Sequence, residues 1–346
     1  MHEEVFNRKS TKFIPPQKTL IVFPDYIGDS VLLTAFLRNY RYNLPENSVV
    51  HVCANKSIAA MLEGNSGIDA IFAKNKISNI KRFLQKRNYD AAIVLDFSLA
   101  WIFNILKSGI KQKVITDMQR MNISLHKFLG SLFTCVLKTT PIADKKPQIE
   151  VYLDFLSQLG LKIFDRQLEV KVDFSEINSC KKLIKDTSKR KIFLHLGASI
   201  YSKQWDNSHW KEVIEHLKDD EIYIIGSETP PAELLLPNVT NLCGKTSLKQ
   251  TISLLYQADI LITTDSAPAH LAAVAKVPNI IVLYGPTNFN QWKPHSPKSN
   301  VIQLHANVSC NPCNLRMCPH LKCLKELKPQ MVIDAIKNIN ITYQGC

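Results

Sequence analysis

The chain alternates short, apolar, β-branched runs with stretches of helical length. This alternation predicts parallel sheets, because parallel strands are joined by right-handed helical crossovers. The pattern pauses after a probable helix at 147–161, which we expect Gly160 to end, and then restarts. The predicted strands are TLIVF (19–23), SVVHVCA (48–54), DAAIVLDF (90–97), KIFLHLG (191–197), EIYIIGS (221–227), NVTNLCG (238–244), DILITTD (259–265) and PNIIVLYG (278–285).

The restart places a domain boundary near residues 160–175, and a chain of 346 residues suits two domains of ordinary size. The sequence therefore predicts an α/β protein with two doubly wound, Rossmann-like domains that face each other across a cleft. We assign residues 1–165 to the first domain and 166–346 to the second. In such sheets ligands bind outside the carboxyl ends of the strands, so the polar residues at those ends are the first candidates for a site.

The N-terminus is polar, is broken by Pro15 and Pro16, and has no apolar core of signal-peptide length. We interpret it as a flexible lead-in. No apolar run approaches the roughly 20 residues that a membrane-spanning helix needs. A soluble, cytoplasmic protein is the expectation.

The formal net charge is +13, and the excess of basic residues is denser in the first half, notably in KNKISNIKRFLQKR (74–87). Such a stretch is suited to nucleic acid, anionic lipid or a phosphorylated substrate. A solvated amphipathic helix explains it equally well.

The segment TTDSAPAHLAAVA (263–275) joins a predicted strand to a predicted helix. The helix should begin at about Ser266–Ala267, and its first-turn N–H groups together with the helix dipole form an anion site. Asp265 alone would more often be a cap. Because Ser266 can add a hydroxyl donor and His270 lies one turn further along the same face, a ligand site is favoured.

The loop HLGASIYSKQWDNSHW (195–210) follows another strand. Ser199 lies at its small-residue bend. Lys203 is either a solvated surface lysine or a cation that neutralises a diphosphate. The next helix should be capped by Asp206 or Asn207.

Two further strand ends carry weaker signals. Glu228, just past a predicted strand, could accept hydrogen bonds from ribose hydroxyls. The stretch CGKTSLKQ (243–250) suggests a P-loop, but the first glycine of that motif would fall on Val239, so the motif fails. Helix capping by Thr246 or Ser247 is the better interpretation.

In the first domain, FPDYIGDSVLL (23–33) places Asp29 at a helix start. A capping role is favoured by this stretch alone. In a two-domain enzyme, however, Asp29 becomes a candidate general base, with Asp25 in reserve.

Four of the nine cysteines are spaced C-x2-C-x4-C-x4-C, and His320 lies among them. This spacing could hold Zn²⁺ or an iron–sulfur cluster, although it lacks the paired C-x2-C form. Reduced thiols or local disulfides are the alternative, and we expect no metal. The four are Cys310, Cys313, Cys318 and Cys323, in the segment 310–323.

Several of these stretches together resemble glycosyltransferase family 9, the ADP-heptose:lipopolysaccharide heptosyltransferases. They are IGDSVLLTAFLRNY, the LGASIYSKQW loop, the cysteine-containing tail and above all GKTSLKQTISLLYQADILITTDSAPAHLAAVAKVPNIIVLYGPT. Their order and spacing are similar across most of the chain. Two positions depart from the family pattern: Ala267 stands where the family has glycine, and Ala35 where it has proline.

The resemblance implies a GT-B fold, with the acceptor in the first domain and the nucleotide sugar in the second, and an inverting transfer that requires no metal and no cofactor. It implies that Asp29 is the catalytic base and that Lys203 meets the donor phosphates. It places Asp265, Ser266 and His270 on the segment that holds the ADP end of the donor.

The resulting prediction is a glycosyltransferase that moves heptose from ADP-heptose to the lipopolysaccharide inner core. The basic first domain suits a phosphorylated acceptor and peripheral contact with the anionic inner face of the cytoplasmic membrane. One alternative is a related GT-B transferase with another nucleotide sugar or a protein acceptor. Another is a basic nucleic-acid-binding protein with a four-cysteine zinc module, but dispersed basic residues argue against nucleic acid.

Overall fold

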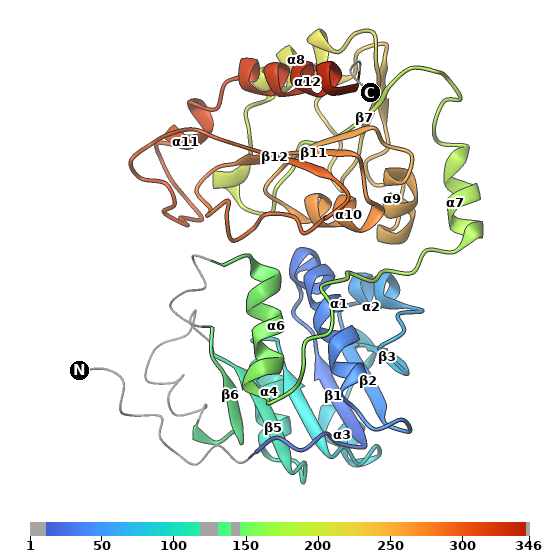
Figure 1. The fold of residues 1–346 in the computed structure, drawn as a ribbon, viewed down its shortest axis with the longest axis vertical. Helices are drawn as coiled ribbons and strands as arrows, with labels where there is room; N and C mark the ends of the chain where they lie inside the picture. Colours follow the sequence, from blue (N-terminus) through green and yellow to red (C-terminus); the bar gives the residue numbers. More distant parts are fainter. Residues whose placement is uncertain (1–11, 118–130, 140–145, 344–346) are drawn as a thin grey trace. The chain divides into compact units, whose positions relative to one another are not determined.

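The computed structural model describes residues 12–117, 131–139 and 146–343 (Figure 1). The first part of the expected N-terminal lead-in, residues 1–11, lies outside them. The chain divides into two compact units. Unit 1 comprises residues 1–143 and 149–171, and unit 2 comprises residues 144–148 and 172–346.

Unit 1 is built on a parallel sheet whose six strands follow the order β3-β2-β1-β4-β5-β6. The central strands are buried along most of their length, and Val22 of β1 lies opposite Cys53 of β2 and Val94 of β4. The described elements are β1 (Lys18–Val22), α1 (Ile27–Tyr42), β2 (Val49–Ala54), α2 (Lys56–Leu62), β3 (Ala70–Ala73), the 3-10 turn η1 (Lys74–Lys76), α3 (Ile80–Gln85), β4 (Ala91–Val94), α4 (Leu99–Leu106), β5 (Gln112–Thr116), β6 (Cys135–Leu137) and α6 (Gln148–Gln158).

Unit 2 is built on a second parallel six-stranded sheet, in the order β12-β11-β10-β7-β8-β9. In its centre β7 pairs with β10, so that His195 lies opposite Thr263. The elements are α7 (Phe174–Lys181), β7 (Lys191–His195), η3 (Tyr201–Lys203), α8 (Asn207–His216), β8 (Glu221–Ile224), η4 (Ala232–Leu234), β9 (Val239–Asn241), α9 (Leu248–Leu255), β10 (Ile260–Thr264), α10 (Ala267–Ala275), β11 (Asn279–Tyr284), β12 (Asn300–His305), α11 (Lys322–Lys325) and α12 (Pro329–Tyr343).

Both strand orders are the doubly wound order in which the chain reverses direction beside its first strand. The reversal lies between β1 and β4 in unit 1 and between β7 and β10 in unit 2. The α/β fold expected from the alternation is therefore confirmed in each unit, and the loops after these four strands are where a ligand should bind.

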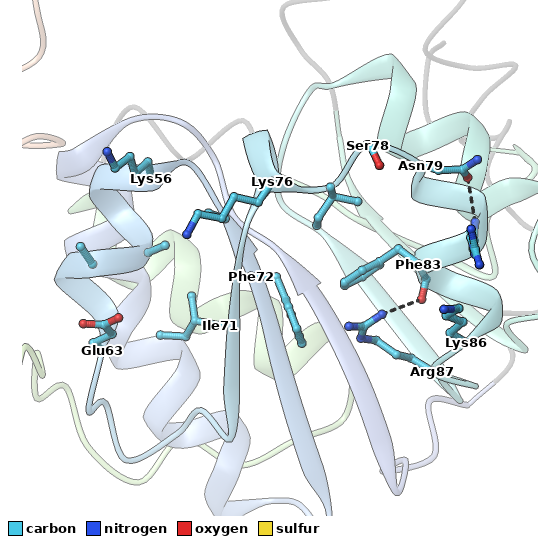
Figure 2. Close-up of a pocket in the computed structure, with 15 residues that line it drawn as sticks. Lys56, Glu63, Ile71, Phe72, Lys76, Ser78, Asn79, Phe83, Lys86 and Arg87 are labelled. Carbon is cyan, nitrogen blue, oxygen red and sulfur yellow. Dashed lines mark hydrogen bonds between the residues drawn. The ribbon is translucent and has the colours of Figure 1, made fainter.

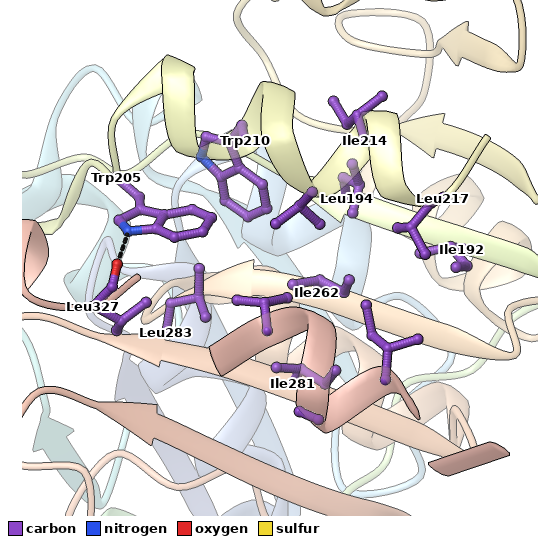
Figure 3. Packing of buried hydrophobic residues seen from close by; sticks show 14 of the residues in the cluster. Ile192, Leu194, Trp205, Trp210, Ile214, Leu217, Ile262, Ile281, Leu283 and Leu327 are labelled. Atoms are coloured by element: carbon purple, nitrogen blue, oxygen red, sulfur yellow. Dashed lines mark hydrogen bonds between the residues drawn. The ribbon is translucent and has the colours of Figure 1, made fainter. Parts of the chain in front are cut away.

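The core of unit 2 packs the apolar side chains of its central strands against α8 and α12 (Figure 3). Trp205 and Trp210 are both buried, and their rings meet edge to face with centroids 4.9 Å apart. The indole Nε1 of Trp205 donates to the carbonyl oxygen of Leu327 over 2.9 Å, which satisfies its only polar atom. This packing anchors the loop that follows η3.

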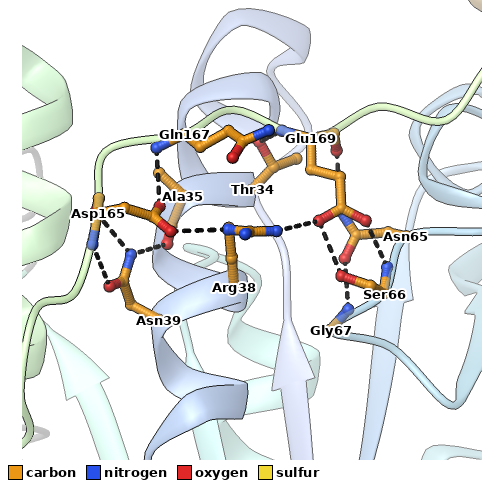
Figure 4. A network of polar contacts seen from close by, with 10 residues as sticks. All are labelled: Thr34, Ala35, Arg38, Asn39, Asn65, Ser66, Gly67, Asp165, Gln167 and Glu169. Carbon is orange, nitrogen blue, oxygen red and sulfur yellow. Dashed lines mark hydrogen bonds and ion pairs between the residues drawn. The ribbon is translucent and has the colours of Figure 1, made fainter.

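A polar network ties the segment 162–169 to α1 (Figure 4). Arg38 bonds Asp165 at 2.9 Å and Glu169 at 3.2 Å. Asn39 is fully buried; its side chain donates to the backbone oxygen of Asp165 and accepts from the backbone N–H of Phe164. These ion pairs and hydrogen bonds hold the segment 162–169 against α1.

The structure confirms the eight predicted strands; seven are shorter than expected, and the first has the expected length but lies one residue earlier. It also confirms both expected caps: Asp206 caps α8 and Ser247 caps α9. The expected helix ended by Gly160 is α6, and Gly160 has a φ of +71°. The basic stretch 74–87 is not one helix. It forms η1 and the short α3, whose first turn is capped by the side chain of Asn79.

Within the residues described here, no helix combines the length and the apolar character needed to span a bilayer.

Candidate functional site

The N-terminus of α10 lies at the carboxyl end of β10. Ser266 precedes the helix in an extended conformation, Pro268 occupies the first turn, and no side chain caps the helix. Ser266 Oγ bonds instead to Thr264 O at 3.1 Å and pairs with His195 Nδ1 at 3.1 Å. The first-turn N–H groups of α10 are thus not used by a capping side chain, as an anion site requires.

Asp265 is not a cap either, because its carboxylate is bonded within the core of the site. Lys203 Nζ lies 2.7 Å from Asp265 Oδ2 and 3.3 Å from its backbone oxygen. The Thr287 hydroxyl donates to the same carboxylate oxygen. Both members of the pair are largely buried, with side-chain exposures of 16% for Lys203 and 6% for Asp265. The structure thus brings together two predicted site residues that are 62 positions apart in the sequence.

The backbone of η3, which carries Lys203, passes very close to Gly285. A Cβ atom at Gly285 would lie 2.9 Å from Ser202 O, closer than real Cβ atoms come, and 3.0 Å from Leu324 Cδ2, which is a tight contact. The Ser202 hydroxyl donates to Leu315 O at 2.5 Å. Glycine at position 285 therefore allows η3 to lie against the end of β11 and bring Lys203 to Asp265.

His195, at the end of β7, is a site residue that the sequence reasoning missed. Its Nδ1 lies 3.1 Å from Ser266 Oγ and 3.3 Å from Thr263 Oγ1. Burial lowers the pKa of His195 to about 4, because the charged ring would lose its hydration. The neutral ring orients the Ser266 hydroxyl through the hydrogen bond between Nδ1 and Oγ. The only signal for His195 in the sequence was that a polar residue ends an apolar strand.

His270 lies one turn into α10 and is 4% exposed. Burial lowers its pKa to about 4; Lys203 lowers it further, and Asp265 opposes the shift. Its Nδ1 has no hydrogen-bond partner among the described residues. A buried ring nitrogen without a hydrogen-bond partner lowers the stability of a protein core. At a binding site, a ligand can supply that partner.

The two remaining predicted donor residues lie on loops at the same edge of the sheet. Ser199 is exposed on the loop after β7, and Glu228 is exposed on the loop after β8. The loop after β7 is tied to β10, since Thr264 Oγ1 donates to Gly197 O at 2.8 Å. The donor roles of Ser199 and Glu228 stay predictions.

In unit 1, Asp29 is the third residue of α1 and not its cap, which is Tyr26. The Tyr152 hydroxyl of α6 donates to Asp29 Oδ1. The carboxylate is therefore held by a residue of a neighbouring helix. Because Asp29 is only half-buried, solvent can still reach it. Tyr152 was not predicted, since nothing in the sequence links two helices 123 residues apart.

Asp25, the reserve candidate, belongs to a separate charged cluster. Lys74 Nζ donates to Asp25 Oδ1 at 2.9 Å, Asp96 Oδ2 at 2.6 Å and Phe23 O at 2.7 Å. Lys74 and Asp96 are mostly buried, whereas the Asp25 side chain is 59% exposed. The cluster joins the ends of β1, β3 and β4, and Asp25 shares its cationic partner, Lys74, with Asp96.

The four clustered cysteines carry free thiols. Cys323 packs in the unit 2 core; burial raises its pKa, and repulsion from Cys310, Cys313 and Cys318 raises it further. In the parts of the chain that the structure describes, no group of three or more His, Cys, Asp or Glu residues is arranged to hold a metal ion.

The pattern of glycosyltransferase family 9 (heptosyltransferase) matches residues 77–324, more than half of the chain. The chain belongs to this family. It is a glycosyltransferase, and the alternative of a nucleic-acid-binding protein is not supported.

Two heptosyltransferases show the extent of the likeness. Lipooligosaccharide heptosyltransferase 2 of Campylobacter jejuni is 29% identical over 337 residues, which are 93% of this chain and 98% of the relative. Lipopolysaccharide heptosyltransferase 3 of Escherichia coli is 24% identical and covers 91% of this chain and 95% of its own. The likeness therefore extends over both units.

Solved structures of glycosyltransferases share the fold. The ADP-heptose lipopolysaccharide heptosyltransferase II of Escherichia coli superposes with a TM-score of 0.73 at 19% identity, covering 94% of this chain and 99% of that one. TibC of enterotoxigenic Escherichia coli, described as an iron-containing dodecameric glycosyltransferase, gives a TM-score of 0.61 at 13% identity. The match covers 96% of this chain and 78% of that one. At these identities the structures support the GT-B fold alone.

Proposed function

We propose that this member of the family transfers heptose from ADP-heptose to a hydroxyl group of the lipopolysaccharide or lipooligosaccharide inner core, with inversion at the anomeric carbon. The relatives named above support the sugar and the acceptor class. The observation that carries the proposal is the uncapped N-terminus of α10 beside the buried pair of Lys203 and Asp265.

The donor diphosphate would bind at the start of α10. The first-turn N–H groups, the Ser266 hydroxyl and the Lys203 ammonium supply donors and positive charge where the leaving ADP gains negative charge. Asp265 holds Lys203 in place, and His270 Nδ1 is a further partner for the bound donor. Ser199 and Glu228 would contact the phosphate and the ribose.

The reaction is a single displacement. Asp29 accepts the proton of the acceptor hydroxyl as that oxygen bonds to the anomeric carbon and the bond to the ADP oxygen breaks. Tyr152 holds the carboxylate during this step. A displacement of this kind needs no cofactor. The acceptor is lipid-linked, so we place the enzyme at the cytoplasmic face of the inner membrane as a peripheral protein.

Asp29→Asn tests the base, because it keeps the side-chain shape but removes the proton acceptor. Turnover should fall roughly 10²–10⁴-fold, with nearly unchanged donor affinity. Asp25→Asn is the matched control, and it should keep most of the activity. Transfer is followed by ADP release and by the mass of the product, and donor affinity by calorimetry. Near-normal turnover of Asp29→Asn would remove Asp29 from the mechanism.

The donor itself is tested by screening nucleotide sugars. ADP-heptose should be turned over far faster than ADP-glucose or a UDP-sugar. A clear preference for another nucleotide sugar would keep the reaction class but overturn the proposed substrate.

A further inference from the structure

A hollow of about 560 Å³ lies in unit 1 at the outer edge of the sheet, and Asp29 is not among the residues that line it (Figure 2). Its walls come from α2 and α3, and β3 with the turn that follows it forms the base. Because β3 is the last strand on this side, its outer edge has no neighbouring strand among the residues that the structure describes. We call this hollow the edge groove.

The base of the edge groove is apolar. Strand β3 has the sequence AIFA, and all four of its residues are half-buried, unlike the fully buried β4. Ile71 and Phe72 point to opposite sides of β3 (Figure 2). Both line the groove, as does Ile77. Edge strands are usually protected by charged side chains of their own, and this one has none.

The rim of the edge groove is strongly basic. Five cationic residues line it, against the single acidic residue Glu63. None of the five takes part in a salt bridge with any residue that the structure describes. The five are Lys56, Lys76, Arg82, Lys86 and Arg87.

Arg87 is held in place by its neighbours. Its guanidinium carbon lies 4.1 Å from the ring centroid of Phe83 and 4.6 Å from that of Phe72. Its Nη1 donates to Phe83 O at 3.3 Å. A planar guanidinium fixed in this way can bind a phosphate through two parallel hydrogen bonds without first losing side-chain entropy.

We propose that the edge groove binds the phosphate headgroup of an anionic membrane phospholipid and docks unit 1 on the bilayer surface. In this arrangement the cations pair with the phosphate, and the apolar base contacts the glycerol and the first acyl carbons. This inference rests on the proposed function only in that a lipid-linked acceptor gives the docking a purpose.

The chemistry of the base distinguishes this occupant from other anions. A free phosphate or sugar phosphate would leave the apolar base in water. Nucleic acid would need exposed aromatic faces for its bases, but Phe83 is only 7% exposed, and Arg87 lies over one face of the Phe72 ring and one face of the Phe83 ring.

The test is flotation of the full-length protein with vesicles of phosphatidylglycerol and phosphatidylcholine, and with phosphatidylcholine alone. The groove variant is Arg82→Gln, Lys86→Gln and Arg87→Gln. The matched control, Lys181→Gln, Lys182→Gln and Lys218→Gln, removes the same charge from exposed positions of unit 2. The groove variant should lose affinity for anionic vesicles by on the order of 100-fold, and the control by less than about threefold. Equal losses would show that only net charge matters.

A second variant keeps the test valid if the first one fails to fold. Lys56→Gln with Lys76→Gln changes two exposed side chains of the groove and should weaken vesicle binding by roughly tenfold. Arg87→Lys keeps the charge but loses the planar fork, and it should also weaken binding. Tighter binding of the unmodified protein to a single-stranded oligonucleotide than to anionic vesicles would overturn the proposal.

Transfer to a soluble, deacylated acceptor separates this inference from the proposed function. The groove variant should keep the turnover and the acceptor KM of the unmodified enzyme in this assay. A raised KM would place the acceptor in the groove and would overturn lipid docking. Absence of transfer by the unmodified enzyme would refute the proposed function and leave the vesicle result standing.

Discussion

Lys203 and Asp265 depend on each other, because each is a buried charge that the other neutralises. Lys203→Ala should therefore do two things. It removes a cation from the phosphate site, and it leaves the Asp265 carboxylate buried without its counter-ion, which typically costs about 3–5 kcal/mol of stability.

The double variant Lys203→Ala, Asp265→Asn separates the two effects. It should recover most of the melting temperature lost by Lys203→Ala, since no unpaired charge remains, but it should not recover donor affinity. Calorimetric titration with ADP and thermal unfolding check both results. Recovery of affinity together with stability would show that Lys203 only supports the fold.

His195 and His270 give unit 2 a defined response to acid. Each has a folded pKa of about 4, below the ordinary value of 6.5, so the unfolded chain binds more protons between these pH values. The free energy of unfolding should have its full value above pH 6.5. It should fall as the pH drops toward 4, by on the order of 3 kcal/mol for each histidine. His270→Gln should flatten the curve of melting temperature against pH. His216→Gln, at an exposed position of α8, should leave the slope unchanged.

The candidate site residues could be proposed from the sequence where their signal was local. Asp29, Lys203 and the segment around Ser266 stand beside apolar strands, where a polar group signals a ligand. Contacts across the sequence give no such signal. The bond from Tyr152 to Asp29 depends on how α6 packs beside α1, and the pairing of His195 with Ser266 depends on the order of the strands.

Among the elements, η3 has a position that depends on a single residue, Gly285. Gly285→Ala should push Ser202 and hence Lys203 away from β11, because the new Cβ would lie 2.9 Å from the Ser202 carbonyl oxygen. Donor affinity should fall about tenfold or more, with a loss of roughly 1–3 kcal/mol in stability. The control is Gly109→Ala, since a Cβ there meets no atom within 4 Å. Equal effects of the two substitutions would contradict this role for Gly285.

The contact between α1 and α6 gives a second prediction. Tyr152→Phe keeps the packing of the ring and removes the hydroxyl that bonds Asp29. Turnover should fall by roughly tenfold with the KM for donor unchanged, as expected when a hydrogen bond to a charged group that positions the base is lost. A lower melting temperature with unchanged turnover would mean that the bond serves only the fold.

The strands that escaped prediction share a physical property. They are β3, β5, β6 and β12, which lie toward the sides of their sheets and carry many half-exposed residues. A strand buried on both faces appears in the sequence as a continuous apolar run, and a short strand at the side of a sheet does not.

For the molecule as a whole, metal content is the property most easily measured. We expect purified protein to contain well below one equivalent of zinc or iron, and a chelator to leave its melting temperature unchanged. Elemental analysis and thermal unfolding with and without chelator are the measurements. A full equivalent of either metal, lost together with stability on chelation, would assign it to Cys310, Cys313, Cys318 and Cys323.

The two sheets have the same strand order, so one architecture occurs twice in this chain. In each unit the candidate site residues lie on or beside a few loops after the central strands, and the rest of the unit has only to keep those loops in place. Many sequences can do that. This freedom explains how a chain 19% identical to a solved heptosyltransferase can share its fold over 94% of its length. It also offers a route to new specificities: exchanging the loops after β7, β8 and β10 between family members should alter the donor while leaving the scaffold intact.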